Sequence, residues 1–327
     1  MLSRDEFRRL VFKRDGSTCI VPGCGKAAVD AHHIIERKLW ARDENEGYFA
    51  DNGVSVCERH HKLAEVIIPP QMLRKWALIS NRVMPKALNA GKDYDKWGVE
   101  LKMPTREYIK FPSTPYLPFS EQVGEFVTDS MLLLNMPLLV TEKMDGSNVV
   151  LTSGKIAARN GTHADHPSFD LLKAEHASRK QRIPLGVQVF GEWLYAKHSI
   201  HYTGDLALDS FMQIFHAYDV RTRCFLGWDD VKALAEQVGY PVVPALAENV
   251  EYSNIWEFQA HITKMAQRVI KEGREGIVVR PMTPFHYSHF EQYTGKYVRA
   301  NHVQTDEHWR ERTIVRNEKR ISNQAAK

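Results

Sequence analysis

The sequence has few cysteines and lacks a long apolar run, and both features exclude classes of protein. Four cysteines in 327 residues are too few for the disulfide framework on which small secreted domains depend. The longest apolar stretch, residues 131–140, is broken by Asn135 and Pro137, whereas a membrane-spanning helix needs about 20 apolar residues. Charged side chains stand at the start of the chain, where a secretory signal has its apolar run. We therefore expect a cytoplasmic protein with no membrane partner.

The composition is otherwise that of a globular protein, with 43% hydrophobic, 26% charged and 10% aromatic residues. The net charge of +4 is unevenly distributed along the chain. Residues 1–110 carry a net charge of +5, residues 111–295 of −5, and residues 296–327 of +4. Basic flanks suit a polyanion such as nucleic acid, and acidic residues in the centre suit divalent cations. Solvated surface charge without a binding role is the alternative interpretation.

The pattern of apolar residues changes near residue 108, where we place a domain boundary. Before it, helical spacing predicts a helix over 5–14 and helices over 62–88, separated by a loop region rich in Gly and Cys and interrupted at Pro69-Pro70. After it, short β-rich runs alternate with turns, and helical patterns lie at 168–182, 228–238 and 255–272. Because strands and helices mix without regular alternation, the sequence predicts an α+β fold with a mainly antiparallel sheet.

Three of the four cysteines stand with a histidine at metal-ligand spacing. Cys19-x4-Cys24 is followed by Cys57-x2-His60, with 32 residues between Cys24 and Cys57. Zinc prefers four tetrahedral sulfur and nitrogen ligands, and a closed site of this kind would stabilise a domain too small for a core of its own. The spacing therefore predicts a structural Zn²⁺ site, with isolated core cysteines and a surface histidine as the alternative. Cys224, alone in a predicted strand, is expected in the core.

Polar residues at the same end of the chain add a second pattern: Asp30-Ala31-His32-His33, Asp51-Asn52-Gly53, and His61 directly after the last zinc ligand. Over residues 19–61 the chain resembles the HNH endonucleases, a small ββα-metal module with treble-clef zinc ribs. The resemblance implies that His33 is the general base, that His32 and His61 hold the catalytic divalent ion, and that Asn52 fixes the loop that orients the base.

This segment departs from the HNH pattern in two places. His32 stands where many members have an aspartate, and His60 replaces the last zinc cysteine, so that His60 and His61 could exchange roles. Two interpretations therefore stay open: an active nuclease, and a zinc-stabilised module that only binds nucleic acid or packs on its neighbour.

The segment Thr141-Glu142-Lys143-Met144-Asp145-Gly146-Ser147-Asn148 lies between two apolar runs predicted as strands. Alone it is weak evidence, because Asp-Gly is a common hairpin turn. Five companions follow it in order: Ala158-Arg159-Asn160-Gly161, Val189-Phe190-Gly191-Glu192-Trp193, Phe215-His216-Ala217-Tyr218-Asp219, Glu275-Gly276-Ile277-Val278-Val279-Arg280 and Gly295-Lys296-Tyr297-Val298-Arg299. Over about residues 111–301 this ordered set resembles the covalent nucleotidyltransferase superfamily of ATP-dependent ligases and capping enzymes. Within it, the set is most similar to phage-type RNA ligases that seal nicks in duplex RNA.

The resemblance implies a reaction in three steps. Lys143 attacks the α-phosphate of ATP and gives lysyl-AMP, the AMP moves to a 5′-phosphate end, and a 3′-hydroxyl then attacks that end. A lysine with the reference pKa of about 10.4 is almost fully protonated at neutral pH. We therefore expect the pKa of Lys143 to be lowered by a Mg²⁺ or Mn²⁺ ion, by Lys296 and by partial burial.

The same resemblance implies roles for the other motif residues: adenine contact by Glu142, base stacking by Tyr218 with Phe215 as the fallback, ribose contact by Glu192, phosphate contact by Asn148 and Arg159, magnesium ordering by Asp145 and Glu275, and charge neutralisation by Lys296. The last motif departs from the two-lysine form of the family, because Val298 takes the second position and Arg299 follows it. Arg280 ends a predicted strand, where we expect a solvated side chain.

The predicted organisation is an HNH-like zinc domain over 1–65, a helical linker over 66–107, a nucleotidyltransferase domain over 108–301 and a basic C-terminal helix over 302–327. The 28 residues after Arg299 are too few for a five-stranded OB-fold, which favours an RNA ligase over DNA ligases and capping enzymes.

Our leading hypothesis is an ATP-dependent RNA ligase for RNA repair, whose zinc module binds nucleic acid or processes ends. Its substrate would be RNA, with a nicked duplex or an RNA/DNA hybrid as candidate forms. The alternative is a metal-dependent HNH nuclease with a regulatory nucleotidyltransferase-like domain. A third hypothesis is a zinc adaptor that binds nucleic acid and has two inactive sites.

Overall fold

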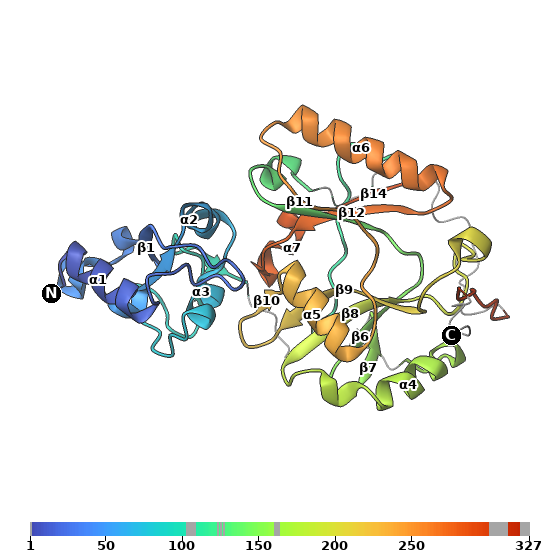
Figure 1. Ribbon diagram of the computed structural model, residues 1–327, viewed down its shortest axis with the longest axis horizontal. Coiled ribbons are helices and arrows are strands. Elements are labelled where there is room, and N and C mark those ends of the chain that lie inside the picture. The colour runs from blue at the N-terminus through green and yellow to red at the C-terminus, as the bar shows by residue number, and fades with distance from the viewer. Residues whose placement is uncertain are drawn as a thin grey trace, which may run out of the picture. The chain divides into compact units, whose positions relative to one another are not determined.

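The computed structural model describes residues 2–102, 109–122, 124, 126, 128–159, 164–300 and 313–320. The chain forms two compact units (Figure 1). The first unit comprises Met1–Thr105 and two short later segments, Arg221–Phe225 and Thr283–Ser288; the second comprises the rest of the chain. Among the described residues, no helix combines the length and the apolar character needed to cross a bilayer.

The first unit is built from short elements: α1 (Arg4–Arg14), β1 (Asp30–His33), β2 (Gly53–Val56), α2 (Glu58–Val66), α3 (Pro70–Trp76), β3 (Asp93–Tyr94), β4 (Glu100–Leu101), β10 (Cys224–Phe225) and β13 (Phe285–His286). Its strands pair antiparallel, β1 with β2, β3 with β4 and β10 with β13. α1 begins with a capping box in which Ser3 and Glu6 exchange hydrogen bonds. One turn apart on this helix, Phe7 and Val11 are buried and pack with Ala31 of β1.

The structure of this unit differs from the sequence expectation in two respects. The β1–β2 hairpin lies in the region predicted as loop, because strands of four residues are too short to show an alternating pattern. Helices α2 and α3 flank Pro69, and Pro70 occupies the first turn of α3, but residues 77–88 are not helical. Residues 66–102, expected to form a helical linker, pack within the first unit and include the β3–β4 hairpin.

The second unit contains two antiparallel sheets. One has the order β11 (Ala245–Val250), β5 (Leu138–Glu142), β12 (Gly276–Pro281), β14 (Gly295–Val298); the other contains β9 (Met212–Asp219), β8 (Val187–Trp193), β6 (Ser147–Leu151) and β7 (Ile156–Ala158), in that order. The helices are α4 (Asp170–Ala177), α5 (Trp228–Val238), α6 (Ile255–Lys271) and α7 (Phe290–Tyr293). α6 covers β12 and β14, and α5 packs against β9 (Figure 1). This mixture of helices and antiparallel sheets confirms the predicted α+β class.

Residues 143–146, which we call the lysine turn, connect β5 of one sheet to β6 of the other. β5 is buried along its whole length between β11 and β12, so it holds the start of the turn rigidly. At the other end, a Cβ atom on Gly146 would lie 2.7 Å from the carbonyl oxygen of Trp193. Only glycine allows this close approach of two backbones. The lysine turn is therefore fixed where the two sheets meet.

Two predicted helices form where expected. α5 lies at 228–238 and α6 at 255–271, because each has a strong apolar stripe. α5 ends at Gly239, which has a left-handed conformation. α6 begins after Asn254, whose side chain caps the helix. Of the basic helix expected over 302–327, the described part, residues 313–320, is not helical. It makes isolated β-bridges through Arg316 to Ala196 and through Lys319 to Leu208. Residues 302–312 and 321–327 lie outside the described residues.

Candidate functional site

A cavity of about 680 Å³ lies at the lysine turn of the second unit. Its wall includes six of the residues predicted from the motifs: Glu142, Lys143, Asn148, Arg159, Glu192 and Lys296. These residues come from β5, β6, β8, β14 and the loops that follow β5 and β7. Asp145, Tyr218 and Glu275 were also predicted, but they are not among the lining side chains.

Lys143 is held by its backbone and by one carboxylate. Its amide donates to the carbonyl oxygen of Gly276 at 2.9 Å, and its Nζ lies 2.7 Å from Oε2 of Glu275. Burial lowers the pKa of Lys143, but the charges of Glu275 and Glu192 outweigh burial and raise the pKa above its ordinary value. The expected lowering of this pKa by burial and Lys296 is therefore wrong for the protein on its own. The pKa of Lys143 is thus set by three acidic residues from separate segments, Glu275, Glu192 and Asp145.

Glu192 is a carboxyl group of the cavity whose pKa is far above its ordinary value. Burial raises the pKa of Glu192 to about 8, and the charges of Glu275 and Asp145 act in the same direction, while Lys143 opposes them. Its Oε1 accepts a hydrogen bond from the amide of Gly146 at 3.2 Å. A glutamic acid that keeps its proton at neutral pH can donate a hydrogen bond to a hydroxyl group. Glu192 can thus contact a sugar hydroxyl without adding negative charge.

Asp145 is placed differently from the prediction. Its Oδ2 accepts a hydrogen bond from the amide of Ile200 at 2.6 Å, and its own amide donates to the hydroxyl of Tyr202 at 2.9 Å. Burial raises the pKa of Asp145, and its hydrogen bond from Ile200 opposes this rise. Asp145 therefore ties the lysine turn to the loop after β8, and its carboxylate does not face the cavity as a metal ligand would.

The apolar end of the cavity corrects the choice of stacking residue. Phe215 and His216 line the cavity, whereas Tyr218 is 1% exposed and does not. The pairing of β9 with β8 shifts register at Phe215, between the pairs Phe190–His216 and Gly191–Ile214, so strict alternation is broken there and the adjacent residues Phe215 and His216 both line the cavity. Phe215 is also fixed by Phe111, with ring centroids 4.9 Å apart. The aromatic ring available to a bound base is that of Phe215, which the sequence offered only as a fallback.

Arg280 lies in the cavity wall and not at a solvated strand end, contrary to the prediction. It is 3% exposed, donates a hydrogen bond to the carbonyl oxygen of Phe215, and stacks over the ring of Trp228 at 5.1 Å. Burial lowers the pKa of Arg280 to about 9. Arg280 thus holds the strand that carries Phe215. This role could not be predicted from an arginine near the end of a strand.

Glu142 places an acceptor beside this apolar end. Its Oε2 pairs with Arg274, and its buried Oε1 has no hydrogen-bond partner among the residues that the structure describes. Burial raises the pKa of Glu142, and the neighbouring charge of Arg274 opposes the rise. A buried oxygen without a partner is costly unless a ligand supplies a donor. The amino group of an adenine is a donor of this kind.

Cationic side chains also line the cavity. Arg159 donates to the hydroxyl of Ser113 at 2.7 Å, and the Nζ of Lys296 lies 3.9 Å from the ring centroid of Tyr116. Burial lowers the pKa of Lys296 to about 8, and the charge of Lys143 adds to this effect. Lys110 also lines the cavity, and the sequence analysis missed it because the residue precedes the first recognised motif. Such a set of cations suits a polyphosphate or a phosphate terminus.

The first unit brings the four predicted zinc ligands together. The ligand atoms of Cys19, Cys24, Cys57 and His60 all lie within 4.8 Å of one another. Nδ1 of His60 is 3.2 Å from Sγ of Cys19 and 3.3 Å from Sγ of Cys57, and the sulfurs of Cys24 and Cys57 are 3.8 Å apart. Three sulfurs and one nitrogen in a closed cluster are a suitable ligand set for Zn²⁺.

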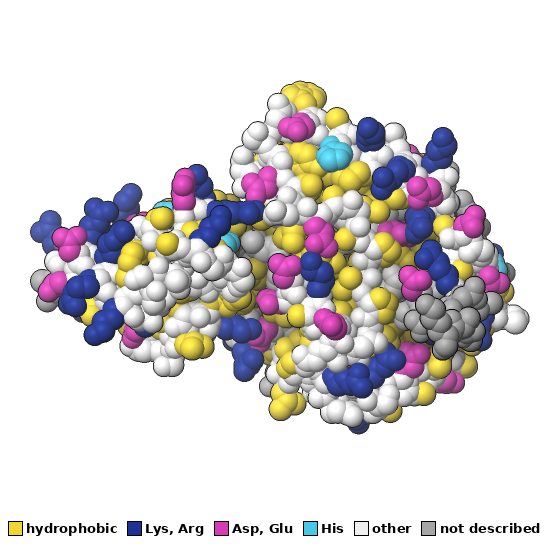
Figure 2. Space-filling view, viewed as in Figure 1, with side chains coloured by type: hydrophobic (Ala, Val, Ile, Leu, Met, Phe, Trp, Pro, Cys, Tyr) yellow, Lys and Arg dark blue, Asp and Glu magenta, His cyan; other side chains and the backbone are white. Residues whose placement is uncertain are grey.

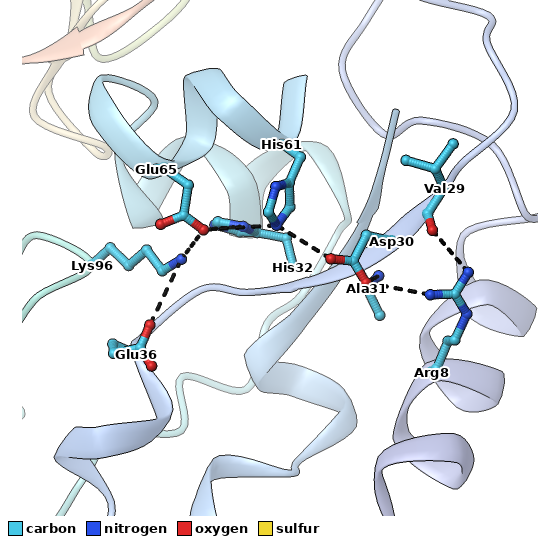
Figure 3. Close-up of polar contacts among 9 residues, drawn as sticks. All are labelled: Arg8, Val29, Asp30, Ala31, His32, Glu36, His61, Glu65 and Lys96. Carbon is cyan, nitrogen blue, oxygen red and sulfur yellow. Dashed lines mark hydrogen bonds and ion pairs between the residues drawn. The ribbon is translucent and has the colours of Figure 1, made fainter. Parts of the chain in front are cut away.

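A second cluster in this unit joins two predicted residues to one that the sequence analysis missed. His32 of β1 and His61 of α2 point toward Glu65, one turn further along α2, and their ligand atoms lie within 4.8 Å of one another (Figure 3). Nδ1 of His32 is 3.4 Å from Oε1 of Glu65, and Nε2 of His61 is 3.3 Å from Oδ2 of Asp30. The spacing of His61 and Glu65, four residues apart on a helix, was the available signal.

Lys96 adds a cation to this second cluster. Its ammonium pairs with Oε1 of Glu65 and lies 3.9 Å from Glu36 (Figure 3). The hydrogen bond from His32, followed by the contact with Lys96, lowers the pKa of Glu65 to about 2. Glu65 is therefore ionised at any physiological pH, and two imidazoles with one carboxylate are a suitable ligand set for a divalent ion.

His33 and Asn52 lie on other sides of the β1–β2 hairpin. His33 stacks on Phe7 with centroids 4.5 Å apart and contacts Tyr48, so the structure does not bring it to the His32 cluster. Successive residues of a strand point to opposite faces, which explains this separation. Burial, with a smaller effect of Arg37, lowers the pKa of His33 to about 4. Asn52 bridges the chain by donating to the carbonyl oxygens of Ile35 and Gly47, a loop-fixing position.

Comparison with known proteins links the second unit to RNA ligases. The sequence model of the RNA ligase family matches residues 136–298, a range that runs from just before β5 to the end of β14 and includes the lysine turn. No curated protein matches the chain. The sequence match makes this region similar to RNA ligases, and the first unit up to residue 102 lies outside it.

Solved structures with a similar arrangement are also ligases. An archaeal ATP-dependent RNA ligase is 19% identical, with 65% of this chain and 53% of that chain covered and a TM-score of 0.41. A mutant RNA ligase of Naegleria gruberi with ATP and Mn is 15% identical, with 77% and 72% covered and a TM-score of 0.43. The same ligase with PPi is 14% identical, with 87% and 78% covered and a TM-score of 0.39. This chain spans about half the length of the archaeal ligase.

Proposed function

We propose that this protein is an ATP-dependent RNA ligase that joins 3′-hydroxyl and 5′-phosphate ends through an AMP bonded to Lys143. The observation that carries the proposal is the position of Lys143. Its amine lies 2.7 Å from Glu275, in a cavity lined by aromatic and cationic side chains, within the segment that matches the RNA ligase family. A nucleotide bound with its base at one end and its phosphates at the other would place its α-phosphate near this amine.

The residues of the cavity would orient ATP from both ends. The adenine would stack on Phe215, and its amino group would donate to the buried Oε1 of Glu142. Protonated Glu192 would donate to a ribose hydroxyl. Arg159 and Lys296 would neutralise the phosphates, together with Asn148. Fixing the nucleotide at both ends converts the attack into an effectively unimolecular step.

Lys143 must lose its proton before it can attack, because the charge of Glu275 raises the pKa of this amine. Glu275 offers a carboxylate oxygen of the type that Mg²⁺ or Mn²⁺ prefers, and such an ion, when bound, would neutralise phosphate charge and weaken the hold of Glu275 on the amine. The freed amine forms a bond to the α-phosphorus as the bond to the β-phosphate oxygen breaks, and pyrophosphate leaves.

The later steps return Lys143 to its initial state. An oxygen of the 5′-phosphate end attacks the phosphorus of the adenylate, and the bond from that phosphorus to Nζ breaks. The 3′-hydroxyl then attacks the activated 5′-phosphate and loses its proton, and AMP leaves. Lys296 and Arg159 line the end of the cavity where both phosphates would pass.

We assign nucleic-acid binding to the first unit, stabilised by Zn²⁺ on Cys19, Cys24, Cys57 and His60. Supporting this, α1 carries five basic residues, and Lys and Arg side chains gather over it in Figure 2. End processing by an HNH-type site is a second candidate function, favoured by the cluster of His32, His61 and Glu65. The position of His33 on the other face of β1 favours binding over cutting.

The test is to incubate the full chain with Mg²⁺ and ATP labelled at the α-phosphate, and to measure label retained after denaturation. We expect one label per chain for the wild type and none for Lys143→Ala. Lys271→Ala, which changes an exposed lysine at the end of α6, is the matched control and should retain the label. Nicked duplexes of RNA, DNA and mixed strands then define the substrate, and we expect sealing to require RNA at the 3′-hydroxyl side.

A further inference from the structure

Residues 313–320, which we call the C-terminal strap, belong to the second unit and lie far from the lysine turn in sequence. The strap bridges to Ala196 through Arg316 and to Leu208 through Lys319. Between these bridges, Asn317 is 1% exposed. A fully buried asparagine in a strap that is otherwise largely exposed calls for an explanation, because burying an amide is unfavourable unless its hydrogen bonds are made.

The amide of Asn317 makes hydrogen bonds to the loop 194–202, which follows β8. Its Oδ1 accepts from the amide of Tyr202 at 2.9 Å, and its Nδ2 donates to the carbonyl oxygens of Leu194 at 2.8 Å and Ala196 at 3.3 Å. The backbone amide of Asn317 also donates to the carbonyl oxygen of Tyr195 at 2.9 Å. Both ends of the loop are thus tied to one side chain, and only a carboxamide supplies the acceptor and both donors.

The loop 194–202 in turn holds the lysine turn. The hydroxyl of Tyr202 accepts from the amide of Asp145, and the amide of Ile200 donates to Oδ2 of Asp145. On the same loop, Nε2 of His198 lies 3.2 Å from the hydroxyl of Ser147, and both side chains line the cavity. Two steps of buried hydrogen bonding therefore connect Asn317 to the residue two positions after Lys143.

We propose that Asn317 is a positioning residue for nucleotidyl transfer, which holds the lysine turn in place through Tyr202 and Asp145. This inference rests on the proposed function of the lysine. Asn317 does not touch the cavity, so its effect would be on the geometry of attack and not on nucleotide contact. A displacement of about 1 Å in a reacting group is enough to slow a reaction on the order of 100-fold.

Other contacts allow the strap to remain in place when Asn317 is changed. The guanidinium of Arg316 lies 5.3 Å from the ring centroid of Tyr195, and the ammonium of Lys319 lies 4.6 Å from that of Phe211. These cation–π contacts and the backbone bridges do not depend on the amide. Substitution of Asn317 should therefore loosen the loop 194–202 without releasing the strap.

The experiment measures single-turnover formation of the AMP adduct as a function of ATP concentration, in the full chain. For Asn317→Ala we expect the maximal rate to fall about 10- to 100-fold, with the concentration of ATP at half-maximal rate changed less than about twofold. Val315→Ala, at an exposed position of the strap, is the matched control and should keep the wild-type rate. Tyr202→Phe removes the hydroxyl next to Asp145, and Asn317→Ala should add no further loss to it, because both act through the same contact.

A merely structural role would lower the thermal midpoint of Asn317→Ala and leave the adduct rate unchanged well below that midpoint, which overturns the inference. Independent, multiplicative losses in the double variant also overturn it. If Asn317→Ala does not fold, Tyr202→Phe at the wild-type rate is sufficient to reject it. Absence of adduct in the wild type removes the proposed function and this inference together, whereas adduct formation at equal rates in wild type and Asn317→Ala removes this inference alone.

Discussion

Replacing Glu192 with glutamine should change how the stability of the protein depends on pH. Glu192 has an ordinary pKa of 4.5 and a pKa of about 8 in the folded chain. Between these values the folded state keeps a proton that the unfolded state has lost, so the stability of the wild type falls as pH rises. The contribution is fully present below pH 4.5 and is lost once the pH has passed 8. Glutamine does not titrate and still offers an oxygen to the amide of Gly146.

The size of the effect follows from the shift in pKa. At about 1.4 kcal/mol per unit, the full shift corresponds to roughly 5 kcal/mol. Glu192 is only partly buried, so we discount this figure for solvent screening and expect about 2–3 kcal/mol. The free energy of unfolding of Glu192→Gln, relative to wild type, should thus rise by this amount between pH 5 and pH 8.5 and then level off.

Urea unfolding of both proteins at several pH values, followed by tryptophan fluorescence, measures this difference directly. Taking the difference between variant and wild type removes the titration of other groups to the extent that they are independent of Glu192. Glu236→Gln, at an exposed position on α5, controls for the loss of a surface charge. A difference that stays constant from pH 5 to pH 8.5, or that changes in the opposite direction, would refute the assignment of a protonated Glu192.

Three further outcomes are expected. Phe215→Ala should raise the concentration of ATP needed for half-maximal adduct formation by about 10-fold, since base stacking contributes about 1–3 kcal/mol, whereas Tyr218→Leu, which removes the other candidate ring, should not; equal effects of the two variants would contradict the placement of the base. Cys57→Ser should reduce the zinc content, measured by plasma emission spectrometry, from one ion per chain to near zero and lower the thermal midpoint of the first unit; unchanged zinc would contradict the four-ligand site. Glu65→Gln should weaken binding of Mn²⁺, measured by calorimetry on the zinc-loaded chain, by at least about 10-fold, and equal binding would exclude Glu65 as a ligand.

The sequence predicts best those features that depend on local spacing. The zinc ligands come from two short pairs, and chelation geometry fixes how far apart such residues stand. Helices α5 and α6 were predicted because their apolar stripes are long enough to show the 3.6-residue period. Six residues named from the ordered motifs line one cavity, since each motif lies on one strand or at its end.

The sequence predicts poorly those features that depend on packing between distant segments. Phe215 lines the cavity and Tyr218 does not, and the pairing of β8 with β9 shifts register at Phe215, opposite Phe190/Gly191, which no local pattern reveals. Arg280 and Asn317 are polar residues whose burial is decided by segments far away in the chain. The raised pKa of Lys143 likewise depends on acidic residues that three separate elements bring to it.

Intact-mass spectrometry of the purified chain after incubation with ATP and Mg²⁺ tests the central claim most directly. We predict that the wild type gains the mass of one adenylate, that peptide mapping places it on Lys143, and that Lys143→Ala gains none. A wild type that retains its original mass under these conditions, or an adenylate mapped to a different residue, would contradict the account.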